Sequence, residues 1–295
     1  KNGNKVAVVT AKEKLRRMLS HNLDGICFSA EFANEATLEG NGIENVESDL
    51  MSKERPGIYD PYISVYCIEA GAKLLQREHF DIMYLTTTDF VQHKYAPGDP
   101  EANDFLAKID YWFGELDKLG AIIGVTADHG MQAKTNKDGT PKVQFIEKLL
   151  NEQGIKSRVI LPITDPYVVH HGALGSLVMV HLDDPNRAPE LIDFLLRQEG
   201  LTEVYDREMT ALKLELAPDR IGDICVLSAR DVVVGKTEAD HDLSVLKGGL
   251  RSHGGRYEEM VPMLLSEPLN AAYKLKAAAD PRNVDIFDFA CNAGA

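Results

Sequence analysis

The sequence has few cysteines and no long apolar run. Four cysteines are spread over 295 residues and form no CxxC pair, so the pattern indicates neither a sulfur-ligated zinc site nor a disulfide framework: Cys27, Cys67, Cys225 and Cys291. No stretch of about 18 apolar residues occurs, and we therefore expect no membrane span. Reduced thiols suit a cytoplasmic protein, which is our expectation, although a signal peptide lost before Lys1 is left open.

Basic residues are scarce relative to acidic ones. The chain has 32 Lys and Arg against 46 Asp and Glu, which gives a net charge of -14. Surfaces that bind nucleic acid need clusters of Lys and Arg, so we expect no nucleic-acid partner. A small anionic substrate is still compatible with this charge if metal ions supply a local positive field. Hydrophobic residues make up 44% of the chain, which is enough for a packed core.

Short apolar segments alternate with amphipathic ones over about the first 130 residues. This alternation predicts an α/β fold, with a mainly parallel central sheet covered by helices on both faces. We expect strands at 6–10, 25–29, 81–86 and 121–126, and helices at 11–19, 62–76 and 102–119. Ligand sites of such sheets lie outside the carboxyl ends of the strands, so polar residues that follow these strands are candidates for the site.

The chain from 132 to 249 has a different pattern. We expect strands at 176–182, 221–227 and 232–234 and a helix at 188–199, followed by a return to apolar segments. The sequence therefore predicts a metal-binding α/β core formed by 1–131 and 250–295, with 132–249 inserted as an α+β cap.

Asp89 and His93 follow the strand expected at 81–86. If a helical turn starts there, the i,i+4 spacing places the carboxylate and the imidazole on one face, which suits a zinc ion. Taken alone, the pair is better explained by a helix cap and a surface histidine.

Two further polar clusters follow apolar segments. Asp128 and His129 come directly after a strand that we expect to be buried, where a carboxylate needs a partner, and Gly130 would allow a sharp turn. His253 lies in a Ser-His-Gly-Gly turn before another apolar segment. Three clusters of Asp and His at strand ends can converge, and their five side chains are more than one tetrahedral zinc needs.

The ordered series DxxxH, ADHGM and HGG resembles the alkaline phosphatase superfamily, especially its nucleotide pyrophosphatase/phosphodiesterase branch. The resemblance implies an alkaline phosphatase-like sandwich that binds two zinc ions. Asp89, His93 and His253 would hold one zinc, and Asp128 and His129 would hold the second.

Longer stretches are similar to the phosphonoacetate hydrolase family, and they lie at 8–17, 25–31 and 161–176. This resemblance implies hydrolysis of the carbon–phosphorus bond of phosphonoacetate to acetate and phosphate, in which a metal-activated Thr attacks phosphorus. Lys12 and Lys14 match lysines that bind the anionic groups of the substrate. For His170 and His171, in the expected cap, we predict a structural or cap-closing role.

The sequence departs from the family pattern in one respect. The family's Thr or Ser nucleophile and a further metal-binding Asp have no counterpart here, so we expect both upstream of Lys1 and assign neither to Thr10, Thr87 or Thr88. Two alternatives stay open for this reason: a phosphodiesterase or nucleotide pyrophosphatase that cleaves a P–O bond, and a truncated, non-catalytic metal-binding chain. A homodimer is also left open.

Overall fold

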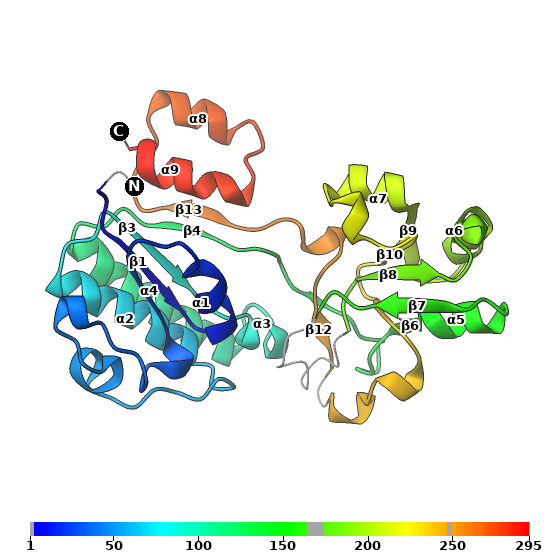
Figure 1. The fold of residues 1–295 in the computed structure, drawn as a ribbon, viewed down its shortest axis with the longest axis horizontal. Helices are drawn as coiled ribbons and strands as arrows, with labels where there is room; N and C mark the ends of the chain where they lie inside the picture. Colours follow the sequence, from blue (N-terminus) through cyan, green and yellow to red (C-terminus); the bar gives the residue numbers. More distant parts are fainter. Residues whose placement is uncertain (1–2, 164–173, 247–248, 295) are drawn as a thin grey trace. The chain divides into compact units, whose positions relative to one another are not determined.

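The computed structural model describes residues 3–163, 174–246 and 249–294, and the chain divides into two compact units (Figure 1). The first unit comprises Lys1–Thr126 and Met263–Ala295, and the second comprises Ala127–Pro262. The function of the second unit as a cap stays a prediction. No helix in the described ranges is both long enough and apolar enough to cross a membrane.

The first unit is built on a parallel sheet of three strands in the order β2-β1-β3. These strands are β1 (Val6–Thr10), β2 (Ile26–Ser29) and β3 (Ile82–Thr86), which agree with the predicted strands to within one residue. Thr10 is paired with Ser29 on one side and with Thr86 on the other. The three strands therefore end at the same level, and the residues that follow them share one edge of the sheet.

One face of this sheet forms the core of the first unit. Ala7 and Val9 of β1 point to this face together with Cys67 of helix α2 (Ile63–Arg77), and all three are fully buried. The alternation of a strand places Tyr84 of β3 on the opposite face, where it is 37% exposed and stacks on Phe287 with 6.0 Å between the ring centroids. The helix α9 (Ile286–Asn292) thus covers this second face only in part.

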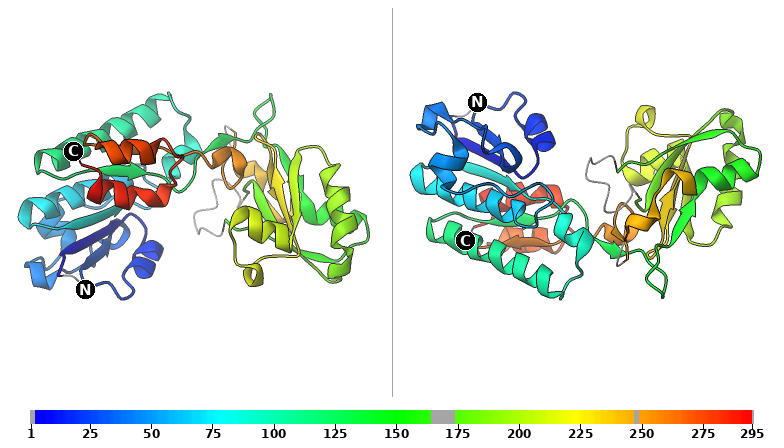
Figure 2. Two further views of the ribbon diagram at one scale, coloured as in Figure 1. Left: turned by 90° about the horizontal axis from the view of Figure 1, so that it is seen from above. Right: turned by 90° about the horizontal axis from the view of Figure 1, so that it is seen from below.

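The remaining elements of the first unit include α1 (Glu13–Leu19), α3 (Phe90–Lys94), α4 (Pro100–Lys118) and α8 (Ala271–Ala277). Strand β4 (Gly124–Thr126) pairs in the antiparallel direction with β13 (Met263–Leu265), and α9 packs beside both (Figure 2). We expected a buried strand at 121–126. The structure confirms a strand over 124–126, but the expected burial was wrong. β4 is short and partly exposed, because β13 is its only paired neighbour among the described residues.

The second unit contains an antiparallel sheet of four strands in the order β7-β8-β10-β9 (Figure 2). The central strand β10 (Ile224–Ser228) is buried at every position, and it lies between β8 (Leu177–Leu182) and β9 (Leu201–Asp206). The outer strand is β7 (Ser157–Ile160). Helices α5 (Ile146–Glu152) and α6 (Ala188–Leu196) supply apolar side chains to the same core.

Five further elements belong to the second unit. The helix α7 (Arg207–Leu214) follows β9, and β6 (Val143–Phe145) pairs in parallel with β11 (Val233–Gly235). A short antiparallel ladder joins β5 (Gln132–Ala133) to β12 (Arg251–Ser252). This last ladder matters for function because candidate metal ligands lie close to both of its strands.

Candidate functional site

The carboxyl edge of the first unit's sheet gathers the residues that follow its strands. The ladder continues one step beyond the strands, since the Ala11 N–H donates to the Thr86 carbonyl at 2.9 Å and the Glu31 N–H donates to the Ala11 carbonyl at 3.2 Å. Lys12 follows β1, and Asp89 follows β3. The first unit therefore carries a candidate cation and a candidate metal ligand at adjacent strand ends, as the sequence pattern predicts.

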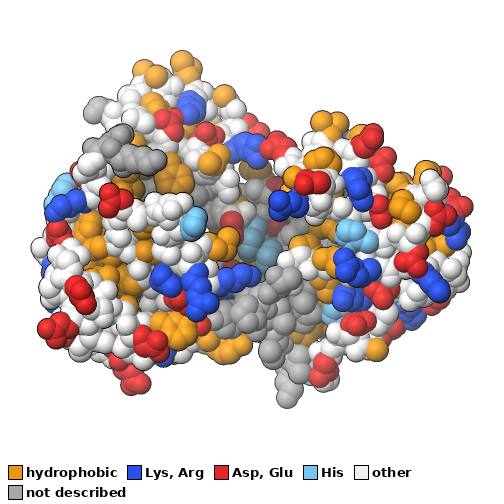
Figure 3. All heavy atoms as spheres, in the orientation of Figure 1, with side chains coloured by type: hydrophobic (Ala, Val, Ile, Leu, Met, Phe, Trp, Pro, Cys, Tyr) orange, Lys and Arg blue, Asp and Glu red, His pale blue; other side chains and the backbone are white. Residues whose placement is uncertain are grey.

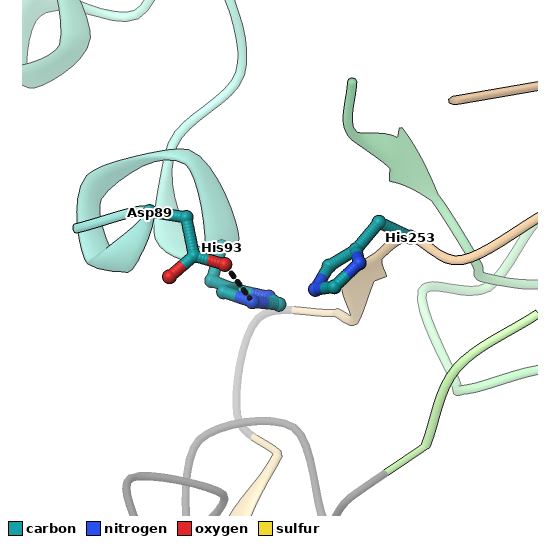
Figure 4. Close-up of side chains that lie close together, drawn as sticks. All are labelled: Asp89, His93 and His253. Atoms are coloured by element: carbon teal, nitrogen blue, oxygen red, sulfur yellow. Dashed lines mark ion pairs between the residues drawn. The ribbon is translucent and has the colours of Figure 1, made fainter. Parts of the chain in front are cut away.

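Asp89 and His93 lie on one face of the turn α3. The His93 N–H donates to the Asp89 carbonyl at 3.0 Å, which confirms the helical turn predicted from the spacing. The Asp89 Oδ2 and His93 Nε2 atoms are 3.0 Å apart (Figure 4, which also draws His253 of the second unit). The His93 side chain is 2% exposed and that of Asp89 is 31% exposed. One oxygen and one nitrogen donor are thus placed where a metal ion can share them.

Buried hydroxyl groups hold the chain at the ends of β1 and β3. The Thr88 N–H donates to Ser64 Oγ at 3.0 Å, and Thr88 Oγ1 accepts from the Phe90 N–H at 3.3 Å. Thr10 is fully buried, and its hydroxyl donates to the Lys12 carbonyl at 2.8 Å. The hydroxyl groups of Thr10 and Thr88 therefore stabilise these turns.

Basic side chains gather over α1 on the first unit (Figure 3). Lys12, the residue before the helix, is half-buried, and Lys14 is exposed. Arg16 donates to both carboxylate oxygens of Glu13, at 2.8 and 2.6 Å, and Arg17 donates to Glu13 at 3.1 Å. Both arginines are thus engaged by an acid of their own helix.

Glu13 also fixes α1 to the neighbouring strand, because Ser29 Oγ donates to its carboxylate at 2.8 Å. The hydrogen bonds from Arg16, assisted by Ser29, lower the pKa of Glu13 to about 2. A carboxylate with a depressed pKa in the folded state stabilises the protein above its unfolded pKa, and this stabilisation is lost as the pH falls.

We expect Glu13→Gln to lower the free energy of unfolding at pH 7 by about 1.5 to 3 kcal/mol, the range for hydrogen bonds to a charged group. The difference from the unsubstituted chain should shrink as the pH falls from about 5 to about 2, because the native carboxylate is then protonated as well. Urea unfolding at several pH values measures this difference. A difference that is independent of pH would show that the Glu13 charge does not stabilise α1.

Asp128 and His129 lie at the start of the second unit, directly after Ala127. The Asp128 side chain is 89% exposed, so our expectation of a buried carboxylate that needs a partner was wrong. Asp128 is exposed because the strand before it, β4, is short and itself partly exposed. The His129 N–H donates to Asp128 Oδ1 at 3.2 Å, and His129 Nδ1 lies 2.9 Å from the Gly130 carbonyl. An exposed carboxylate beside an oriented imidazole can still bind a cation.

Gly130 is needed for close packing rather than for a turn. Its φ is not positive, in contrast to that of Gly254, which is 100°. Its N–H donates to the Glu258 carbonyl at 2.7 Å, and a Cβ at this position would lie 3.3 Å from that oxygen. The predicted sharp turn at Gly130 is therefore replaced by a close contact between two backbone segments.

His253 lies beside His129 because of the ladder between β12 and β5. Ser252 is paired with Gln132, so the residues that follow β12 run past those that precede β5. The imidazole rings of His129 and His253 stack with their centroids 3.6 Å apart and their planes at 4°. The second unit therefore brings together two of the predicted ligands that are distant in sequence.

The five predicted ligands are thus placed as two groups. Asp89 and His93 lie in the first unit, and the other three lie in the second. Their convergence on neighbouring metal ions stays a prediction, as does the role of Lys12 and Lys14. His170 and His171 lie outside the described residues.

Sequence reasoning missed three residues that organise these segments: Glu13, Lys134 and Glu258. The only sequence signal for Glu258 was its position three residues after Gly255. At that spacing a Glu side chain can accept from the backbone N–H of the N-cap residue, as Glu258 does from Gly255.

Comparison with known proteins places the chain in a family. Residues 28–256 match the family model for type I phosphodiesterase/nucleotide pyrophosphatase. The chain is 46% identical to a phosphonoacetate hydrolase of Sinorhizobium meliloti 1021 in complex with phosphonoacetate. The match covers 99% of this chain and 72% of that chain, with a TM-score of 0.88. The structure of that hydrolase with phosphonoformate matches at 45% identity, the same coverage and the same TM-score.

Human ectonucleotide pyrophosphatase/phosphodiesterase 5 shares the fold at 14% identity and a TM-score of 0.52, over 99% of this chain and 72% of that chain. These matches agree with the resemblance that the DxxxH, ADHGM and HGG motifs indicate. The chain is a homologue of phosphonoacetate hydrolase, and it belongs to the type I phosphodiesterase/nucleotide pyrophosphatase family.

Proposed function

We propose that this protein hydrolyses phosphonoacetate to acetate and phosphate. The observation that carries the proposal is the 46% identity, over 99% of the chain, to a hydrolase whose structure holds phosphonoacetate. In the reaction the bond between the methylene carbon and phosphorus breaks. Phosphorus gains the oxygen of a water molecule, and the carbon gains a proton.

The donor set suits two zinc ions. Asp89, His93 and His253 each offer one ligand atom, a carboxylate oxygen or an imidazole nitrogen, and these are the donors zinc accepts. We assign Asp128 and His129 to a second ion. Bound there, the two ions would supply positive charge for the phosphonate oxygens.

The hydrogen bonds within each unit support this assignment. The backbone bond from His93 to Asp89 orients both side chains of the first unit toward one point. In the second unit, His129 Nδ1 lies 2.9 Å from the Gly130 carbonyl, and His129 Nε2 lies 3.7 Å from Asp128 Oδ1, so a ring nitrogen and a carboxylate oxygen are close to each other. Such contacts fix the orientation of an imidazole ring before a metal binds.

Lys12 and Lys14 would bind the substrate carboxylate. Carbon is a poor leaving group unless its negative charge passes into the adjoining carboxylate, so a cation beside that carboxylate acts chiefly in the transition state. The position of Lys12 just beyond β1, at a strand end next to that of Asp89, supports this role.

The proposal is tested by comparing phosphate release from phosphonoacetate with the hydrolysis of a nitrophenyl phosphodiester, with a metal count on the same sample. The assay should use the chain together with any sequence that its gene encodes before Lys1. We expect phosphonoacetate to be turned over faster than the nitrophenyl phosphodiester. The metal count should give two zinc ions per chain.

The family match to a phosphodiesterase model makes P–O cleavage the second candidate. Preferential hydrolysis of the diester would support that candidate and overturn the proposal. Bound metal without turnover of either substrate would instead indicate a non-catalytic metal-binding protein. Asp89→Asn serves as the control that separates metal-dependent turnover from background hydrolysis.

A further inference from the structure

The second unit contains a buried ion pair that the proposed chemistry does not use. The Lys134 and Glu258 side chains are 0% and 1% exposed, and Lys134 Nζ lies 2.9 Å from Glu258 Oε1. Lys134 Nζ also donates to the Arg230 carbonyl at 2.8 Å. Lys134 directly follows β5, and its own N–H donates to the Leu250 carbonyl at 2.8 Å, which extends the ladder to β12.

Glu258 has two further partners, and each lies beside a candidate metal ligand. Its second carboxylate oxygen, Oε2, accepts from the Gly255 N–H at 2.9 Å, two residues after His253. Its backbone carbonyl accepts from the Gly130 N–H at 2.7 Å, one residue after His129. One residue therefore holds the backbone next to both stacked imidazoles.

Stability alone does not explain this pair. Removing two charges from water costs free energy, and replacing a buried ion pair by apolar residues of similar volume is often neutral or stabilising. An apolar pair, however, could not accept the Gly255 hydrogen bond. What the carboxylate adds is a fixed acceptor between Lys134 and the turn that carries His253.

We propose that Glu258, held in place by Lys134, is a positioning residue that fixes His253 relative to His129 and so sets the affinity of both for metal. This inference rests on the proposed function, because it takes His129 and His253 as ligands. Partners that orient metal ligands typically change metal affinity by 10- to 100-fold when they are removed.

Two double variants separate positioning from packing. Lys134→Met/Glu258→Gln and Lys134→Met/Glu258→Met both replace the ion pair by neutral side chains of similar size. Only the glutamine can still accept the Gly255 hydrogen bond. We expect the variant with two methionines to bind zinc about 10- to 100-fold more weakly than the variant with glutamine, in a competition titration of the metal-free chain against a chromophoric chelator.

The imidazole resonances of His129 and His253 in the metal-free chain give a second readout, because stacked rings shift each other's signals. We expect these resonances to move only in the variant with two methionines. If that variant does not fold, Glu258→Asp tests the same point. It keeps the charge but is one methylene shorter, so it should also weaken zinc binding.

Leu195→Ala is the matched control, since Leu195 of α6 is fully buried in the core of the same unit. It should lower stability without changing zinc affinity. Equal zinc affinities for the two double variants, or an equal loss in Leu195→Ala, would overturn the positioning role. If His253→Ala weakens zinc binding while the double variants bind equally, only this inference fails. If His253→Ala has no effect, the proposed metal assignment fails.

Discussion

His253→Ala is expected to weaken zinc binding by more than about 100-fold and to slow phosphate release from phosphonoacetate by about 1000-fold. We expect this loss of zinc affinity because removing a metal ligand should have a larger effect than removing a residue that only orients a ligand, which costs 10- to 100-fold. The slower phosphate release follows if the metal supplies about 4 kcal/mol of charge stabilisation in the transition state. Competition titration and a phosphate assay measure the two effects.

The matched control for this prediction is His181→Ala. His181 is a partly exposed histidine on β8 of the same unit, and it is not among the proposed ligands. It should leave zinc affinity and turnover unchanged. Chelation of the metal should abolish turnover of the unsubstituted protein, and added zinc should restore it. Equal zinc affinity in His253→Ala and His181→Ala would remove His253 from the metal site.

The sequence predicts well the features that depend on local pattern. The strand β1 appears as an apolar run because it lies between β2 and β3 and packs against α2, and the burial of Ala7 and Val9 follows from that. The turn at Asp89 and His93 is equally local, since a spacing of four residues fixes which side chains share a helical face.

Features that depend on distant partners could not be predicted in this way. The apolar segment before Asp128 gave no sign that its strand would have β13 as its paired neighbour, so the burial of Asp128 was overestimated. The contact that explains Gly130 is made by Glu258, which lies more than a hundred residues along the chain. Lys134 looks like a surface lysine in sequence, and only the ladder between β5 and β12 explains its full burial.

Lys12→Ala is expected to reduce phosphonoacetate turnover far more than it reduces the hydrolysis of a phosphate ester that has no carboxylate. Loss of one hydrogen bond to a charged group in a desolvated site costs about 1.5 to 3 kcal/mol, which corresponds to roughly tenfold to a hundredfold in rate. The effect should appear in kcat as well as in kcat/KM, because the carboxylate gains charge only as the carbon leaves.

Three further variants complete this test. Lys12→Arg should recover part of the rate because it keeps the positive charge, and Lys14→Ala should show the same selectivity as Lys12→Ala if both lysines contact the substrate. Lys118→Ala, at an exposed position at the end of α4, should have no effect on either substrate. Equal losses on both substrates in Lys12→Ala would place Lys12 at the phosphoryl group or in the scaffold. No loss on either would make it an ordinary surface residue, and the preference for phosphonoacetate would then have to come from other residues.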